Sequence, residues 1–362
     1  MKNQFKDNPQ LLPLLCKIDK LIELSERKGK RFNFMEICGT HTVSILKHGF
    51  RSYFKDKIKF ISGPGCPVCV TSQKDMDRVI ALAKSGVKIA TFGDLIKVPG
   101  SHSSLEEQQA LGKQIDVVYS PLDCLKIAEN ADEEVVFIAV GFETTIPVIA
   151  SLVLDAERMN IKNLSILAII KTIPNALKFL LANLETEIDG FICPGHVSVI
   201  IGEQPYNIIP EKYGIPCAIA GFDPVDIALG IESLITQIKD KNPIVANRYK
   251  RMVKLDGNPA ARNLINEVFE EDDVDWRGFG KVPASGLKLR KRFAKFDADK
   301  KFDIKVETTS EPKGCICGEI IAGKKLPAEC QLFAKKCTPD SPVGPCMVSF
   351  EGSCAAFYKY GE

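Results

Sequence analysis

The sequence lacks any long uninterrupted run of apolar residues. Its longest uncharged stretches, such as residues 190–202, fall short of the roughly 18 residues that a membrane-spanning helix requires. The first residues, MKNQFKDNPQ, also lack the continuous apolar segment of a secretory signal peptide. These two absences predict a protein that does not enter the membrane and that resides in the cytoplasm.

The sequence also lacks an imbalance of charge. Its 48 Lys and Arg residues against 46 Asp and Glu residues give a net charge of +2. No run of basic residues provides the field that nonspecific binding to nucleic acid or anionic lipid needs. Nucleic-acid and membrane-surface partners are therefore disfavoured.

Nucleotide-binding motifs are absent as well. No Gly-x-Gly-x-x-Gly motif appears, so nothing supports a nicotinamide or flavin enzyme. Residues 318–325 match a phosphate-binding P-loop up to Lys324, but Lys325 stands where that motif has the magnesium-binding Ser or Thr. The segment also lies among cysteines rather than after a strand, so we interpret the match as accidental.

Cysteine, by contrast, is abundant and unevenly distributed. Six of the 13 cysteines fall in the last 48 residues: Cys315, Cys317, Cys330, Cys337, Cys346 and Cys354. In a small secreted chain such a density predicts a disulfide framework. In a large chain without a signal peptide it indicates metal or redox chemistry.

Short β-rich apolar runs alternate with helix-patterned segments along most of the chain. The predicted strands form a first set at residues 32–37, 58–62, 87–92 and 116–119 and a second set at 135–140, 164–170, 190–192 and 217–220. Between them lie helical patterns such as residues 72–85, which Gly86 ends, and residues 105–114. The alternation predicts an α/β fold with two similar parallel-sheet domains, covered by helices on both faces.

This pattern divides the chain into four regions. We expect a helical N-terminal arm at residues 1–30, a first α/β domain at 31–130, a second α/β domain at 131–224, and an α-rich, cysteine-rich third region at 225–362. The third region opens with a helix over residues 223–239, with Asp223 as N-cap, Pro224 in the first position and Asp226 completing a capping-box-like start. Residues 242–305 show little β alternation.

Reactive residues follow the first two predicted strands. In open α/β sheets the ligand site lies beyond the carboxyl ends of the strands, where this sequence places CGTHT (residues 38–42) and GPGCPVC (residues 63–69). Adjacent parallel strands lie about 4.8 Å apart. We therefore expect Cys38, Cys66 and Cys69 to lie within reach of one small ligand.

Cys38 precedes a predicted short helix at residues 43–48. The positive N-terminus of that helix should lower the pKa of the Cys38 thiol and favour the thiolate. His41 could share a metal with Cys38 or tune its thiolate. The alternative is a small buried cysteine beside a turn.

Cys66 and Cys69 form a CxxC motif just before the helix that Ser72 can cap. Three chemistries fit this motif: a dithiol redox pair, half of a zinc site, and thiolates near another metal. The Gly-Pro-Gly turn at residues 63–65 makes an inert role less favoured, because packing alone rarely demands such a turn.

The C-terminal cysteines begin as Cys315-x-Cys317 and then follow after gaps of 12, 6, 8 and 7 residues. A four-iron cluster takes four thiolates, so two of the six cysteines would remain and could form a disulfide beside it. Structural zinc held by four cysteines is the alternative, although this segment lacks the CxxC knuckles of paired zinc sites.

Five motifs together resemble the HypD family of [NiFe] hydrogenase maturation factors. They are CGTHT at 38–42, GPGCPVC at 63–69, GFETT at 141–145, CPGHVS at 193–198 and the six-cysteine tail, and the match runs from about residue 30 to the end. The resemblance implies a scaffold on which the Fe(CN)2CO group of the hydrogenase active site is assembled. Its implied partners are the small chaperone HypC, the cyanide donor HypE and, indirectly, the [NiFe] hydrogenase large subunit.

The resemblance also implies roles for individual residues. Cys38 would hold the iron, shared with the N-terminal cysteine of HypC, and His41, Cys66 and Cys69 would line the same cleft. Through a further resemblance to ferredoxin-thioredoxin reductase, it assigns Cys315, Cys330, Cys337 and Cys354 to a [4Fe-4S] cluster and Cys317 and Cys346 to a redox-active pair.

Two other functions stay open. One is a cluster-dependent thiol-disulfide reductase, in which Cys317 and Cys346 reduce the CxxC pair or a disulfide of a partner. The other is a zinc-dependent protein, hydrolytic or structural, in which Cys38, His41 and the CxxC cysteines form a closed Cys3His site.

Overall fold

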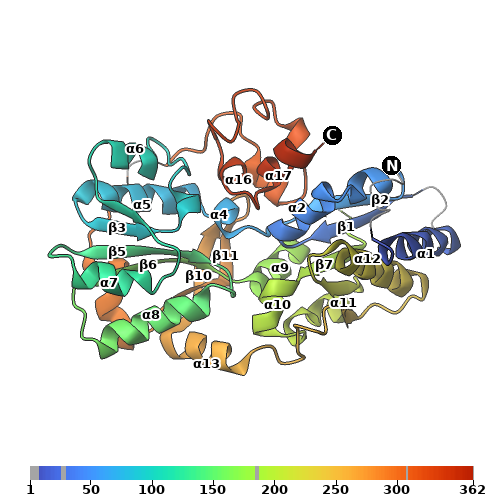
Figure 1. The fold of residues 1–362 in the computed structure, drawn as a ribbon, viewed down its shortest axis with the longest axis horizontal. Helices are drawn as coiled ribbons and strands as arrows, with labels where there is room; N and C mark the ends of the chain where they lie inside the picture. The colour runs from blue at the N-terminus through green and yellow to red at the C-terminus, as the bar shows by residue number, and fades with distance from the viewer. Residues whose placement is uncertain (1–7, 26–29, 184–186, 307–308, 362) are drawn as a thin grey trace.

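The computed structural model describes residues 8–25, 30–183, 187–306 and 309–361, and its strands form two sheets with helices packed against them (Figure 1). The strands are β1 (Phe32–Glu36), β2 (Ile58–Ser62), β3 (Lys88–Thr91), β4 (Ile115–Val117), β5 (Val135–Gly141), β6 (Leu164–Lys171), β7 (Gly190–Pro194), β8 (Cys217–Ala220), β9 (Val245–Asn247), β10 (Phe269–Trp276) and β11 (Gly280–Leu289). The first sheet is parallel, in the order β2-β1-β7-β8-β9. The second, in the order β10-β11-β6-β5-β3-β4, is mixed because β11 runs antiparallel to both of its neighbours.

All eight strands predicted from the sequence are present, with bounds within two residues of the prediction. Their burial explains why the apolar runs could be recognised. Every residue of β5 and β8 is buried, as expected for central parallel strands covered on both faces.

The two predicted sets of four strands, however, do not correspond to the two sheets. β1 pairs with β7 of the second set, with Phe34 opposite Gly190, and β3 pairs with β5, with Ile89 opposite Val136. Among the described strands, the chain passes between the sheets after β2, after β6 and after β9. Neither sheet is therefore built from residues 31–130 alone or from residues 131–224 alone. Local sequence patterns predict the strands but do not specify which distant strands become neighbours.

The antiparallel hairpin of β10 and β11 corrects a second expectation, that residues 242–305 have little β structure. Acidic residues occupy the outward positions of β10, whose sequence is FEEDDVDW, while Phe269 and Trp276 are buried at its ends. Between its ends this edge strand has no fully buried residue, so its hydrophobic alternation is weak and the sequence pattern does not reveal it.

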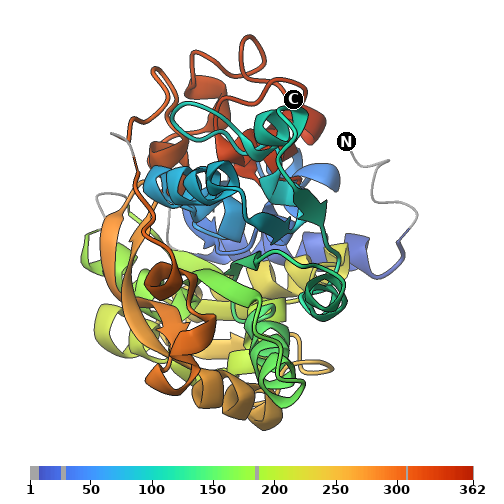
Figure 2. The same ribbon diagram turned by 90° about the vertical axis from the view of Figure 1, so that its left-hand side faces the viewer.

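The C-terminal cysteine-rich region contains short helices joined by loops, as expected. They are α15 (Cys317–Ile321), α16 (Pro345–Val348) and α17 (Ser353–Tyr360). The region lies above the junction of the two sheets, and Figure 2 shows it on the same side in a second view. Within it, α15 and α16 pack against α4 (Pro67–Val70), while α17 packs against α2 (Gly39–Lys47).

Of the predicted helical arm at residues 1–30, Leu11–Leu24 form the helix α1, and residues 1–7 and 26–29 lie outside the described residues. This helix packs on α12 (Pro224–Lys239), burying Leu11, Leu15 and Ile18 in the core that covers the first sheet. Burial of each of these side chains contributes roughly 1.5–3 kcal/mol. The helices not yet named are α3 (Phe50–Tyr53), α5 (Gln73–Ser85), α6 (Leu105–Ala110), α7 (Asp123–Glu129), α8 (Ile146–Arg158), α9 (Ile173–Ala182), α10 (Gly195–Ile201), α11 (Ile208–Tyr213), α13 (Pro259–Val268) and α14 (Ala298–Lys301).

The predicted ends of α5 and α12 are observed, with Asp223 at the N-cap and Pro224 in the first position of α12, but only α5 has a side-chain capping bond. Ser72 Oγ accepts a hydrogen bond from the Asp75 amide, and Gly86 ends the helix with φ +97°. At α12 the Asp223 side chain makes no capping bond, and the Asp226 carboxylate binds Arg251 through two hydrogen bonds of 2.7 and 2.5 Å. Within the described ranges, no helix is long and apolar enough to cross a membrane.

Candidate thiol and metal centre

The loops that follow β1 and β2 meet, as the sequence analysis predicts for neighbouring parallel strands. The Gly39 amide donates a hydrogen bond to the Gly65 carbonyl oxygen at 3.1 Å. A Cβ on Gly65 would lie 2.5 Å from the Cys38 Cα. Only glycine at position 65 therefore lets the CxxC loop approach Cys38 this closely.

Cys38 occupies the N-cap position of α2 with an extended backbone and is 9% exposed. Burial, aided by the Glu351 carboxylate, raises the pKa of the Cys38 thiol to about 11, against the opposing effect of the Thr40 hydroxyl and nearby backbone groups. The expectation of a lowered pKa is therefore wrong, because removing the thiolate from water outweighs the helix N-terminus.

A C-terminal loop that the sequence analysis did not identify closes over Cys38. The Thr40 hydroxyl donates a 2.6 Å hydrogen bond to Glu351 Oε1, and a Cβ on Gly39 would lie 2.3 Å from the Glu351 carbonyl oxygen. In the same loop, the Ser349 hydroxyl donates to Asp94 Oδ2 at 3.0 Å. The sequence signal was weak: Glu351 stands three positions before Cys354, and Asp94 follows β3.

The His41 imidazole is buried and points toward the end of β8. Its Nε2 lies 2.9 Å from the Gly221 carbonyl oxygen and 3.3 Å from that of Ala220, so Nε2 carries the proton. Nδ1 has no hydrogen-bond partner among the described residues. Burial lowers the pKa of His41 to about 4, so its ring is neutral near pH 7. The His41 ring stacks on the ring of Phe222, which also contacts the exposed ring of His196.

Both cysteines of the CxxC motif are buried at α4. The Cys69 amide donates to Cys66 Sγ at 3.2 Å, and Cys69 Sγ lies 3.9 Å from the Pro345 carbonyl oxygen. Burial raises the pKa of Cys69 far above its ordinary value, and a hydrogen bond with the Cys346 side chain acts in the opposite direction. The CxxC pair is therefore in contact with the C-terminal cysteine region.

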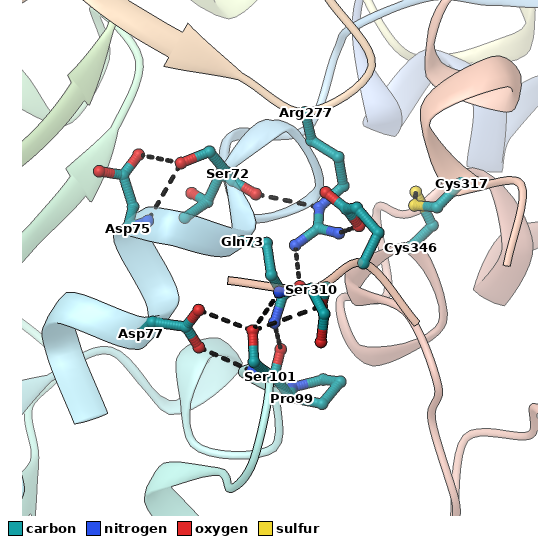
Figure 3. Close-up of polar contacts among 12 residues, drawn as sticks. Ser72, Gln73, Asp75, Asp77, Pro99, Ser101, Arg277, Ser310, Cys317 and Cys346 are labelled. Carbon is teal, nitrogen blue, oxygen red and sulfur yellow. Dashed lines mark hydrogen bonds and ion pairs between the residues drawn. The ribbon is translucent and has the colours of Figure 1, made fainter. Parts of the chain in front are cut away.

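The six C-terminal cysteines line one small cavity together with the apolar side chains of Ile320, Leu332, Phe333 and Met347. Cys317 Sγ lies 2.7 Å from Cys346 Sγ (Figure 3). The Val343 amide donates to Cys337 Sγ at 3.3 Å. The cavity thus combines many thiols with an apolar lining.

The position of Gly344 indicates whether this cavity has room for a bound group. A Cβ at this position would lie 2.8 Å from Cys315 Sγ, although the backbone φ of −131° would accept any residue. The glycine therefore keeps space open beside the sulfurs. Clustered thiolates in an apolar setting fit an iron–sulfur cluster.

The same geometry does not fit the zinc alternative. In the described parts of the chain, no three His, Cys, Asp or Glu side chains are grouped so as to hold a single metal ion. The hydrogen bonds of His41 Nε2 to the carbonyls of Ala220 and Gly221 leave Nδ1 as the nitrogen that could bind a metal, but among the described residues this ring is not grouped with two further His, Cys, Asp or Glu side chains. The cysteines of a four-iron cluster bind separate irons and need not surround one ion.

The GFETT motif contributes a buried carboxyl group just after β5. Glu143 is 4% exposed, its Oε1 accepts a 2.9 Å hydrogen bond from the Ile173 amide, and its Oε2 has no partner among the described groups. Burial raises the pKa of Glu143 to about 7.

Comparison with known proteins gives one consistent result. The sequence profile of the family described as "HypD: Hydrogenase formation hypA family" matches residues 14–361. The chain is 41% identical over 351 residues to hydrogenase maturation factor HypD of Cupriavidus necator, covering 94% of this chain and 93% of that protein. The corresponding proteins of Azotobacter vinelandii (39% over 370 residues; 99% and 96% covered) and Rhodobacter capsulatus (40% over 367 residues; 99% and 97% covered) are similar along their whole length.

Proposed function

The chain belongs to the HypD family of hydrogenase maturation factors, and from this premise we propose that it is the scaffold on which the Fe(CN)2CO group is assembled. The iron group is cargo, which the scaffold receives, completes and passes on. The proposed partners are a HypC-type small chaperone, a HypE-type cyanide donor and, indirectly, the hydrogenase large subunit. With 13 free cysteines, the protein suits a reducing compartment, and we place it in the cytoplasm.

We assign the iron-holding thiolate to Cys38. Soft thiolates suit low-spin iron, and this sulfur is enclosed by the loop that contains Glu351. Because burial holds the pKa of the Cys38 thiol at about 11, the thiol keeps its proton near pH 7 until a metal replaces it. Burial, aided by the Asp94 carboxylate, raises the pKa of Glu351, and we assign Glu351 as the acceptor of that proton.

We assign the resident [4Fe-4S] cluster to Cys315, Cys330, Cys337 and Cys354. The supporting observation is the cysteine-lined apolar cavity that Gly344 keeps open. When bound, such a cluster supplies one-electron chemistry. This assignment leaves Cys317 and Cys346, whose sulfurs are in contact, as a dithiol pair.

The observation that carries the redox part of the proposal is the contact between the two dithiol pairs, through Cys69 and Cys346. Thiol–disulfide exchange would reduce a Cys66–Cys69 disulfide to two thiols while Cys317 and Cys346 become a disulfide. Electrons balance in that step without another reagent. Restoring the Cys317–Cys346 dithiol takes two electrons and two protons, which an external one-electron donor must supply in two steps.

Infrared spectroscopy of the full chain, co-produced with its HypC-type and HypE-type partners, tests the proposal. The wild-type complex should show cyanide and carbonyl stretching bands, and Cys38→Ala should lose them. Cys16→Ala, at an exposed cysteine of α1, is the matched control and should retain them. Full bands in Cys38→Ala would move the iron to another residue, and a wild-type complex without bands would favour the simple reductase.

A further inference from the structure

Arg277 is a buried cation beside the segment that follows the CxxC motif. It stands at the turn of the β10–β11 hairpin and is 3% exposed. Its amide donates to the Val70 carbonyl oxygen at 2.9 Å, one residue beyond Cys69. The hairpin that the sequence did not reveal therefore attaches directly to the CxxC helix.

Each nitrogen of the Arg277 guanidinium donates a hydrogen bond. Nε donates to the Thr71 carbonyl oxygen at 3.1 Å, Nη2 to Gln73 Oε1 at 2.9 Å and Nη1 to Glu311 Oε2 at 2.5 Å (Figure 3). Thr71 and Gln73 follow the CxxC motif, whereas Glu311 precedes Cys315. The planar guanidinium thus links the segment that follows α4 to the segment that precedes the cysteine-lined cavity.

The backbone of the same turn touches the cysteine region. Gly278 has φ +84°, and a Cβ there would lie 2.5 Å from the Gly318 carbonyl oxygen, next to Cys317. Arg277, Gly278 and Cys315 also line a cavity of about 270 Å³. The turn therefore packs between α4 and α15, and its positive charge acts electrostatically on Cys315.

Buried charges are expensive unless a partner compensates them. Among the described residues, the carboxylate bonded to Arg277 is that of Glu311, whose side chain is 62% exposed. Water screens that carboxylate more than it screens the buried guanidinium. Part of the positive field of Arg277 therefore reaches the adjoining Cys315.

We propose that Arg277 is a positioning residue with two effects: it fixes Cys69 against Cys346, and it places a positive charge beside Cys315 that stabilises the reduced cluster. This inference rests on the proposed function and adds to it a residue that is not a cysteine. The two effects can be tested separately. Positioning Cys69 requires the several hydrogen bonds of a guanidinium, whereas the electrostatic effect on the cluster requires only a positive charge at this position.

The geometric effect can be tested without any cluster. In an iron-free Cys66→Ala/Cys317→Ala background, diamide takes two electrons and two protons from Cys69 and Cys346 and joins them in a disulfide, which peptide mapping quantifies. Adding Arg277→Gln or Arg277→Lys should slow its formation about tenfold, because neither side chain reproduces the several hydrogen bonds of the guanidinium. Arg292→Gln, which alters an arginine paired with Glu157 of α8, should leave the rate unchanged.

The charge effect is measured by redox titration of the reconstituted cluster, followed by electron paramagnetic resonance. Arg277→Gln should lower the ratio of reduced to oxidised cluster at a fixed potential about tenfold, equivalent to about 59 mV for one electron. Arg277→Lys retains the charge and should stay within twofold of wild type, as should Arg292→Gln.

Two results would overturn the inference. Unchanged disulfide trapping in Arg277→Lys would remove the positioning effect, and equal potentials in Arg277→Gln and wild type would remove the electrostatic one. If Arg277→Gln does not fold, Arg277→Lys still decides the geometric effect. A wild-type chain that binds no cluster would contradict the proposed function instead, and the trapping experiment would remain interpretable.

Discussion

At the scale of single residues, Cys38 shows how burial can reverse an electrostatic expectation. A helix N-terminus stabilises a negative charge by roughly 0.3–1 kcal/mol at the surface. Raising the thiol pKa from 9.0 to about 11 corresponds to about 3 kcal/mol against the thiolate. Desolvation is the larger of the two effects, so the position of Cys38 in the chain did not determine its reactivity.

This reactivity can be measured by alkylating the iron-free protein across pH 7 to 11. The labelling rate of Cys38 should rise about tenfold per pH unit and level off only near pH 11. Glu351→Gln removes the negative charge but keeps an acceptor for Thr40, so it should lower the pKa and speed labelling several-fold at pH 8. Glu319→Gln, at an exposed site, serves as control. Rapid labelling of wild type at pH 7 would show that the thiol is not desolvated.

Glu143 should make the free energy of unfolding depend on pH. Its pKa rises from 4.5 to about 7 on folding, so its neutral form favours the folded state. That contribution is complete below pH 4.5 and is lost as the pH rises through 7, at a cost of about 3 kcal/mol in unfolding free energy. Glu143→Gln should flatten this decline in denaturant unfolding measured between pH 4.5 and 8. Glu129→Gln, at an exposed site of α7, should leave the decline unchanged, and a decline that persists in Glu143→Gln would assign it to other groups.

At the scale of secondary-structure elements, the proposed cluster assignment divides the cysteines in and between α15, α16 and α17 into two classes. Cys330→Ser or Cys337→Ser should abolish the brown cluster chromophore, because a cluster held by four thiolates rarely tolerates the loss of one. Cys317→Ser and Cys346→Ser should keep the chromophore and lose a titratable disulfide. Bleaching in all four variants, measured by anaerobic absorption, would contradict the division.

The loop before α16 offers a test that leaves every sulfur in place. Gly344→Ala would put a methyl group 2.8 Å from Cys315 Sγ, so the variant should bind less than half of the wild-type iron and sulfide, because an overpacked cavity cannot relax freely. Gly93→Ala meets only Val117, at 3.5 Å, and should bind the wild-type amount. Full cluster content in Gly344→Ala would place the cluster elsewhere.

Among these elements, those with strong local signals could be predicted. The helix α5 has its Ser72 cap and Gly86 stop within the segment itself, and the central strands are continuous apolar runs. The hairpin containing Arg277 could not be predicted, since its outward positions are acidic. The contact of Thr40 with Glu351 spans 311 residues, and no local pattern specifies it.

At the scale of the whole molecule, the iron site and the partner surface should be separable. Cys38→Ala removes one metal ligand but very little surface, and interfaces draw most of their energy from buried aromatic and apolar anchors. A pull-down should therefore recover the HypC-type partner with Cys38→Ala at no less than half of the wild-type yield. Complete loss of the partner, with Cys16→Ala unaffected, would mean that the iron itself joins the two proteins.

The relation between the two sheets was also beyond prediction from the sequence. The motifs identified the loops after β1 and β2, and those loops do meet at Cys38 and Gly65. The exchange of strands between sheets depends on pairings such as Phe34 with Gly190, which only the folded chain makes. The orientation of His41 toward Gly221 follows from the same exchange, since it brings β8 into the first sheet.

The hydrogen bond between Thr40 and Glu351 also has a consequence for when iron can be loaded relative to synthesis of the chain. At roughly 5–20 residues per second on the ribosome, the 311 residues that separate the two partners take roughly 15 to 60 s to synthesise. Throughout that interval Cys38 already exists without the loop that encloses it. Iron delivered then would meet an open strand end that water and oxygen can reach, so productive loading belongs after translation, when the C-terminal cysteines have also been made.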